Sequence, residues 1–246
     1  MAVASLALLG CRPDTVTLGF EPEVGAAYRY RYEIDLAVTR TVDGETPEVT
    51  EISSTLTSAQ KVLEVTPDGV LVEVTIRSEG SAPTTAVVLL DRAGSLRAIE
   101  GADGLTVDEI GVPTADRVLS TGAVAPPEGP LSPGDRWAIA EGGAVGEGRL
   151  QRLGVIAGQD VAEVTASLVQ TLRDDVVVSD SAVALDGALR SKASTTFDLV
   201  DGAVREGSTT SSGTVDVEIS PPPGVTGAPV SASIDYELQV RTVRLD

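Results

Sequence analysis

The stretch that decides the fold is Tyr28-Arg-Tyr-Arg-Tyr-Glu-Ile-Asp-Leu-Ala-Val38. Every second side chain in it is apolar or aromatic, and most of the side chains between them are charged. Alternation with a period of two indicates a β-strand with one buried face and one face in water. A slip of one residue would turn the charges toward the core, so the register of this strand is strongly constrained.

The same alternation recurs at residues 70–77, 215–219 and 234–241. Asp-Gly pairs accept the positive φ angles of tight hairpins, and four of the five in this chain separate alternating runs. The five pairs are Asp43-Gly44, Asp68-Gly69, Asp103-Gly104, Asp186-Gly187 and Asp201-Gly202. Asp174-Asp175 is interpreted as a further turn. This pattern predicts an all-β fold of antiparallel strands joined by hairpins.

The region from 101 to 135 interrupts the alternation. Thr106 and Glu109 have the spacing of a helix capping box, and Pro113 predicts the start of a short helix that ends near Leu119. The run Pro126-Pro-Glu-Gly-Pro130 is typical of a stiff loop. We therefore expect an N-terminal β half at 25–125 and a C-terminal β half at 126–246, together forming one continuous domain.

The two halves share a weak internal repeat. Gly25-x-x-Tyr28 opens the first half and Gly134-x-x-Trp137 opens the second. Late in each half come Leu90-Asp91-x-x-Gly94 and Phe197-Asp198-x-x-x-Gly202. One interpretation is a duplication, and the other is that a glycine before an aromatic strand start is a common local pattern.

The N-terminus, Met1-AVASLALLG-Cys11, resembles a bacterial lipoprotein signal with the cleavage box Leu8-Leu-Gly-Cys11. The resemblance implies that residues 1–10 are removed between Gly10 and Cys11, and that Cys11 carries a diacylglycerol anchor. Residues 11–24 then form a short tether and a first strand. The protein would be extracytoplasmic, attached to the cell membrane by lipid. The alternative interpretation is a free cysteine in an apolar N-terminal strand.

Composition narrows the function classes. The formal net charge is −19, with 37 acidic against 18 basic residues, so the surface repels nucleic acid. Histidine is absent and Cys11 is the single cysteine, which removes the usual zinc sites and the Ser-His-Asp triad. Adjacent carboxylates on a strand point to opposite faces, so Asp174 and Asp175 could share an acid/base site only in a turn, where a solvated hairpin is the simpler interpretation. We expect no enzyme activity, no catalytic residue, no metal and no cofactor. The membrane is the one expected partner, and the sequence identifies no protein partner.

Only Lys61 and Lys192 are lysines, and the other basic residues are arginines, as is typical of high-GC genomes. With Pro133-Gly-Asp-x-Trp137 as a second glycine–aromatic strand start and a Pro-rich middle, the chain resembles uncharacterised bacterial, in particular actinobacterial, lipoproteins. Its overall plan is similar to the LolA/LppX-type lipoprotein carriers. That resemblance implies one large curved antiparallel sheet, an open half-barrel or a clam of two similar halves, around a hydrophobic concavity.

All four tyrosines lie on the apolar sides of the first and last alternating stretches. If these two strands are neighbours, the tyrosines converge, either around a ligand or as an ordinary core cluster. Trp137 is likewise either a ligand contact or a packing anchor. The candidate ligand-facing residues are Tyr28, Tyr30, Tyr32, Trp137 and Tyr236.

The sequence thus predicts a membrane-anchored lipoprotein that binds a hydrophobic or lipid ligand in the concavity of a β-sheet. The alternative is a cell-envelope scaffold or interaction module without a small-molecule ligand, whose acidic outer face meets a cationic partner or divalent ions. An apolar concavity with room for an acyl chain favours the carrier, and a fully packed interior favours the scaffold.

Overall fold

The computed structural model describes residues 15–100, 126–141, 143–178, 181–222 and 224–245. Within them the regular secondary structure is all β, and no α-helix is present. Eleven strands form one antiparallel sheet in the order β6-β5-β4-β3-β2-β13-β12-β11-β10-β9-β8, and β1 pairs with β7. The strands are β1 (Val16–Thr17), β2 (Ala27–Val42), β3 (Glu48–Thr66), β4 (Gly69–Ser78), β5 (Thr84–Leu90), β6 (Leu96–Glu100), β7 (Pro130–Leu131), β8 (Arg136–Glu141), β9 (Ala144–Ile156), β10 (Gln159–Val178), β11 (Ser181–Asp198), β12 (Val204–Ile219) and β13 (Val230–Leu245).

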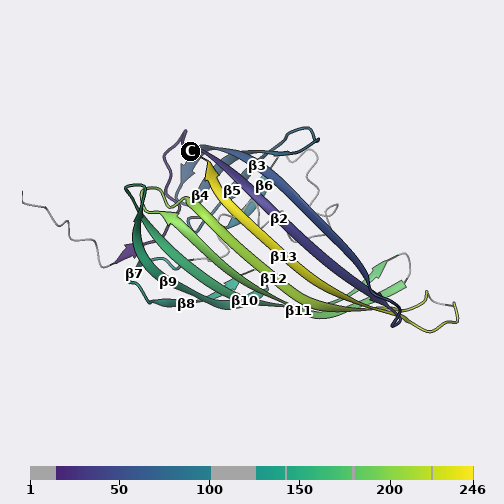
Figure 1. Cartoon of the computed structure of the whole chain (residues 1–246). Coiled ribbons are helices and arrows are strands. Elements are labelled where there is room, and N and C mark those ends of the chain that lie inside the picture. Colours follow the sequence, from purple (N-terminus) through teal and green to yellow (C-terminus); the bar gives the residue numbers. More distant parts are fainter. Residues whose placement is uncertain (1–14, 101–125, 142, 179–180, 223, 246) are drawn as a thin grey trace, which may run out of the picture.

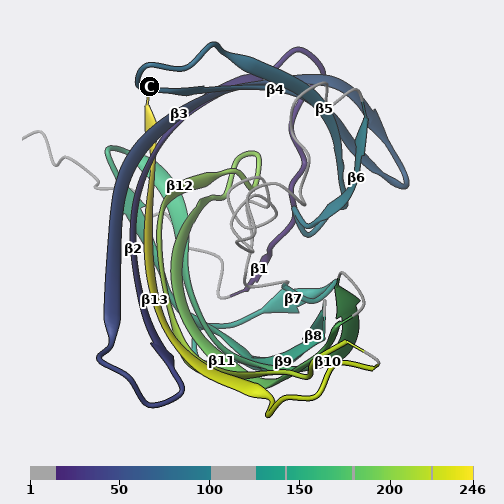
Figure 2. The ribbon, with the colours of Figure 1, turned by 90° about the vertical axis from the view of Figure 1, so that its right-hand side faces the viewer.

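The large sheet curves into an open half-barrel with a C-shaped cross-section (Figure 2). Among the described strands, β6 and β8 form its two edges and do not pair with each other. The predicted fold class, all-β with a large curved antiparallel sheet, is therefore confirmed. The predicted short helix around Pro113–Leu119 lies outside the described residues.

The two predicted halves belong to one sheet. The last strand, β13, pairs along its length with β2 on one side and with β12 on the other. The first long strand and the last strand are therefore neighbours, which is the condition under which the sequence predicts that the tyrosines converge. The longest strand, β10, has 20 residues and is about 66 Å long at ~3.3 Å per residue.

The glycine–aromatic repeat has the same local structure in both halves. Gly25 (φ 88°) and Gly134 (φ 99°) each occupy a turn that only glycine adopts readily. The amide of Gly25 donates to the carbonyl of Val62 (2.9 Å), and the amide of Gly134 donates to that of Leu150 (2.7 Å). The residue after each glycine accepts the return hydrogen bond from the same partner. The register also shifts at equivalent places, directly after Val62 and Leu150.

The second repeated motif is a turn that begins with aspartate. Asp91 Oδ1 accepts the amide of Ala93 (2.9 Å), and Asp198 Oδ1 accepts that of Val200 (3.0 Å). Arg97 and Arg205 occupy the irregular position on the strand that follows each turn, and each forms an ion pair with its aspartate. In both halves a glycine turn, a shift in strand register and an aspartate turn therefore follow one another in the same order.

Two sequence-based turn assignments were wrong. Asp186-Gly187 lies inside β11, where a Cβ on Gly187 would come within 2.4 Å of the Thr214 carbonyl oxygen on β12. This glycine permits close approach of two strands in a strongly curved sheet rather than a tight turn. Asp174-Asp175 lies inside β10 and pairs with residues of β11.

The core lies on the concave face of the sheet, called the inner face below. At one end, called the closed end, the segment that precedes β2 (residues 15–26, called the N-terminal segment below) packs against this face. Its Leu18 and Phe20 are 7% and 3% exposed. The amide of Phe20 donates to the Arg92 carbonyl, and the amide of Glu21 donates to the Asp201 carbonyl. The N-terminal segment is thus bonded to both aspartate turns. The opposite end, called the open end, contains the β2–β3 hairpin and the β12–β13 connection (Figure 1).

Candidate functional site

The inner face at the closed end is filled by aromatic side chains. Tyr28, Tyr30 and Tyr32 project from β2 and are 5%, 1% and 4% exposed. Successive ring centroids from Phe20 to Tyr32 lie 6.2–6.5 Å apart and are tilted, an arrangement in which aromatic pairs attract. The three tyrosines on β2 are therefore packed within the hydrophobic core.

Burial raises the pKa of all three phenols. The pKa of Tyr32 rises to about 12, although hydrogen bonds with Ser58 and Gln60 lower it in part. The hydrogen bond from Tyr28 to Asp201 adds to the effect of burial at Tyr28. These side chains are neutral at any physiological pH and act as core residues with polar tips.

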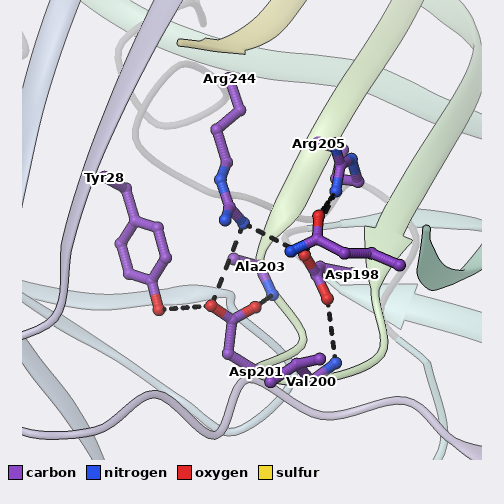
Figure 3. Close-up of polar contacts among 8 residues, drawn as sticks. Tyr28, Asp198, Val200, Asp201, Ala203, Arg205 and Arg244 are labelled. Carbon is purple, nitrogen blue, oxygen red and sulfur yellow. Dashed lines mark hydrogen bonds and ion pairs between the residues drawn. The ribbon is translucent and has the colours of Figure 1, made fainter. Parts of the chain in front are cut away.

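A network of ion pairs and hydrogen bonds connects the strands at the closed end (Figure 3). The Tyr28 hydroxyl donates to Asp201 Oδ2 at 2.9 Å, and the Arg244 guanidinium stacks 5.4 Å from the centre of the Tyr28 ring. Arg244 Nη1 lies 3.7 Å from Asp198 Oδ2 and 4.0 Å from Asp201 Oδ2. Arg205 lies 3.5 Å from Asp198, whose side chain is 2% exposed. Buried Asp198 is thus compensated by two arginines.

The turn between β11 and β12 brings these groups together. Asp201 Oδ1 accepts the amide of Ala203 at 2.9 Å, which fixes the carboxylate inside the turn. A Cβ on Gly202 would lie 1.7 Å from the Gly19 carbonyl oxygen, so only glycine lets the turn touch the N-terminal segment. The network joins β2, β13, this turn and the N-terminal segment. Its role is therefore structural.

Trp137 lies on the inner face of β8 at the edge of the sheet and is 8% exposed. Its indole covers Gly148 on β9, where a Cβ would meet the ring at 2.2–2.5 Å. Trp137 belongs to the same core cluster as the tyrosines of β2.

Tyr236 lies apart from the other three tyrosines. It pairs with Val38 on β2 and with Gly213 on β12, and its side chain is partly exposed. Tyr32 pairs instead with Thr242. Six residues along β13 separate Thr242 from Tyr236, about 20 Å at ~3.3 Å per residue. The structure therefore does not bring the four tyrosines together.

The inner face of the open end is apolar but only partly covered. On β2, Ile34, Leu36 and Val38 continue the face that carries the tyrosines, and all three are partly exposed. Val215 and Val217 on β12 continue it on the other side of β13 and are also partly exposed. The large apolar side chains most exposed on this face are Ile52, Val230 and Ile219, at 51%, 40% and 39%.

These aliphatic residues are not among the ligand-facing residues predicted from the sequence. The alternation that marks the face does extend from Tyr28 to Val38, and it recurs at 215–219. What the sequence lacks is a sign that Leu18 and Phe20 cover one end of this face and not the other.

The described cavities differ between the two ends and the two faces. A cavity of about 20 Å³ at the closed end, between Leu18, Phe20 and Phe197, has room for one water molecule. A groove of about 520 Å³ crosses β3, β2, β13 and β12 at mid-length, where each strand contributes two outer-face residues and the one inner-face residue between them. Three of these are carboxylates, Asp35, Glu51 and Glu237, and none is basic.

Other predicted features remain predictions. Gly10 and Cys11 lie outside the described residues. In the described part of the chain, no group of three or more Asp, Glu or Cys residues is placed to hold a metal ion. No helix in that part is long and apolar enough to cross a membrane. The expectation that the protein is not an enzyme is likewise untested.

No protein-family model and no curated protein matches the chain. Among solved structures, the chain is similar to OmpTdeltaL8, a loop L8 deletion mutant of OmpT, an outer membrane protein of Vibrio cholerae. The two are 9% identical, the match covers 88% of this chain and 99% of that one, and the TM-score is 0.22. A similarity this low supports no argument about fold, function or location. The resemblance to the LolA/LppX-type carriers stays a prediction.

Proposed function

We propose that the protein is an extracytoplasmic lipoprotein, anchored through Cys11, that binds a hydrophobic or lipid ligand against the inner face of the open end. One observation carries this proposal: the apolar inner face is packed at the closed end and partly exposed at the open end. A contiguous exposed apolar surface on a protein whose outer face is polar is typical of a ligand or partner site.

The ligand-contacting residues in this proposal are Leu36, Val38, Ile52, Ile219 and Tyr236. They come from β2, β3, β12 and β13, which are neighbours in the sheet. The ligand would lie on a rigid sheet and would cover aliphatic side chains that water now reaches. Covering about 100 Å² of apolar surface contributes roughly 2.5 kcal/mol, so an acyl chain along several strands gives useful affinity.

The test uses Nile red, an uncharged dye that fluoresces in apolar surroundings, titrated against the protein without detergent. We expect saturable binding by the wild type and at least about tenfold weaker binding by Ile52→Asp, because a carboxylate placed on the apolar face is costly to cover. Val49→Asp is the matched control. Val49 is on the same strand, 59% exposed, and faces outward.

Equal binding by both variants, or no binding by the wild type, would overturn the proposal. Native mass spectrometry of the protein purified from membranes gives a second measurement, since a bound lipid adds a discrete mass. Circular dichroism and thermal unfolding check that both variants keep the wild-type fold.

The alternative, a scaffold or interaction module of the cell envelope, is supported by the outer-face groove. Its three carboxylates and lack of basic residues suit a cationic partner. A wild-type protein that binds neither dye nor lipid would favour this alternative.

A further inference from the structure

The four central strands carry few charges on the inner face. Along β2, β3, β12 and β13, the charged residues that reach the inner face are Arg40 and Glu48 at one end and Arg244 and Arg205 at the other, where Arg205 lies at the irregular position of β12 and pairs with Asp198. Arg40 Nη2 lies 2.6 Å from Glu48 Oε2 at the far edge of the open end. Arg244 lies at the closed end, within 4.0 Å of two aspartates. Each of these charges already has a partner of opposite sign.

Between these positions, the inner face of the four strands consists of apolar, hydroxyl, amide and glycine residues. Ser54 lies between Ile52 and Leu56 on β3 and is partly exposed. Deeper in the face, Ser211 and Ser191 share a hydrogen bond of 2.8 Å. Such a surface offers hydrogen bonds to a polar head group but no spare charge of either sign.

The consequence for an anionic ligand is twofold. A phosphate or carboxylate brought onto this face loses hydration and finds no free cation, which is strongly unfavourable. The formal net charge of −19 adds repulsion, and the carboxylates of Asp35, Glu51 and Glu237 line the opposite side of the same strands. A cationic head group finds no free anion on the inner face of these strands either.

We infer that the ligand of the open end is an amphiphile with an uncharged head group, an acyl chain that ends in a hydroxyl, ester or amide. This inference rests on the proposed function and names the class of ligand for the same site. Acyl carbons contact the aliphatic residues of β2 and β3, and the head group exchanges hydrogen bonds with serine and threonine hydroxyls.

The experiment measures displacement of Nile red from the full-length protein by three amphiphiles with the same acyl chain. They are a monoacylglycerol (uncharged), a lysophosphatidylglycerol (anionic) and an acyl-amide trimethylammonium (cationic), each below its micellar concentration. Measurement at high salt screens the outer carboxylates, so that contacts on the inner face decide the order. We expect the monoacylglycerol to bind at least about tenfold more tightly than either charged amphiphile.

Two matched variants test whether the missing inner-face charge causes the preference for the uncharged amphiphile. Ser54→Arg adds a cation on the inner face, and Ser53→Arg, at the preceding residue, adds the same cation on the outer face. We expect Ser54→Arg to improve binding of the anionic amphiphile relative to the monoacylglycerol by about fivefold or more, and Ser53→Arg to leave the ratio unchanged.

A wild-type protein that binds a charged amphiphile as tightly as the monoacylglycerol would overturn this inference and leave the proposed function standing. An unchanged ratio in Ser54→Arg would also overturn it. If Nile red does not bind and none of the three amphiphiles binds, the proposed function fails, and the inference fails with it.

Discussion

The two ends of β2 carry the same sequence pattern and have different surroundings. Tyr28, Tyr30 and Tyr32 are at most 5% exposed, whereas Ile34 and Leu36, next on the same face, stay partly exposed. Alternation with a period of two determines which face a side chain occupies. It does not determine whether anything covers that face.

The cover comes from parts of the chain that are remote in sequence. Phe20 of the N-terminal segment packs on Tyr28, and Trp137 and Leu150 belong to the same core from the other edge of the sheet. The hydrogen bond from Tyr28 to Asp201 spans 173 residues. The closed end is therefore a packed core, and the open end is an apolar face that stays partly exposed.

The largest expected loss of stability distinguishes the tyrosines of β2 from Tyr236. Tyr30→Ala should destabilise the protein by about 3–5 kcal/mol, because it leaves a cavity where a side chain that is 1% exposed now packs in the core. Tyr236→Ala should cost about 1 kcal/mol, because Tyr236 is partly exposed at the open end. Urea unfolding followed by circular dichroism measures both, and equal losses would contradict the division into two ends.

The next effect concerns the aspartates of the repeated turn. Asp198→Asn keeps an acceptor for the Val200 amide but removes the counter-charge of Arg205 and leaves Arg244 with Asp201 alone, at a cost of about 3 kcal/mol. Asp91→Asn is the matched control. Its partner Arg97 is 57% exposed, so water replaces the lost ion pair, and we expect a loss of about 1 kcal/mol or less. A larger loss at Asp91 than at Asp198 would argue against a charge network specific to the closed end.

A smaller effect tests close packing at the sheet edge. Gly148→Ala places a methyl group against the Trp137 ring and should cost about 2 kcal/mol, with a shift in tryptophan fluorescence. Gly154→Ala on the same strand adds a carbon 3.7 Å from Val161, an ordinary contact, and should be nearly neutral. Thermal unfolding and the emission of the single tryptophan give the measurement. An unshifted spectrum in Gly148→Ala would show that the ring does not cover this glycine.

The last effect, which is small at any one pH step, is a pH dependence. Because burial raises the pKa of Tyr32 from 10.0 to about 12, the folded state binds the phenolic proton more tightly than the unfolded state does. The resulting stability is fully present below pH 10 and is lost as the pH rises toward 12. Each pH unit in this window removes about 1.4 kcal/mol.

Tyr32→Phe isolates this contribution, since phenylalanine carries no ionisable proton. The difference in unfolding free energy between wild type and variant should shrink between pH 10 and pH 12. A constant difference would mean that Tyr32 is accessible to solvent and that the closed end is less tightly packed than described.

Much of the fold could be predicted from the sequence, because strand alternation and hairpin glycines are local signals. The antiparallel sheet follows from such signals, whereas the pairing of β2 with β13 joins strands remote in sequence and was considered only as a condition. Register could not be predicted, so Tyr236 was expected beside the other tyrosines and instead pairs with Val38. Asp186-Gly187 was misassigned because a glycine needed for close strand approach has the same sequence as one needed for a turn.

The candidate site was predicted less well, because the predicted ligand-facing residues were aromatic and those of β2 belong to the core. Ile52 and Ile219 carry no distinguishing sequence feature, since their exposure depends on what the N-terminal segment leaves uncovered.

The most direct test of the division into a closed and an open end is quenching of tryptophan by a monoacylglycerol with a brominated acyl chain. Bromine quenches only by near contact, and Trp137 is the single native tryptophan, buried among the closed-end residues. Ile52→Trp adds a second indole on the inner face of the open end. We predict weak quenching in the wild type and strong quenching of the added fluorescence in Ile52→Trp. Strong quenching of Trp137, with the indole at position 52 unaffected, would place the ligand at the closed end and contradict the proposed site.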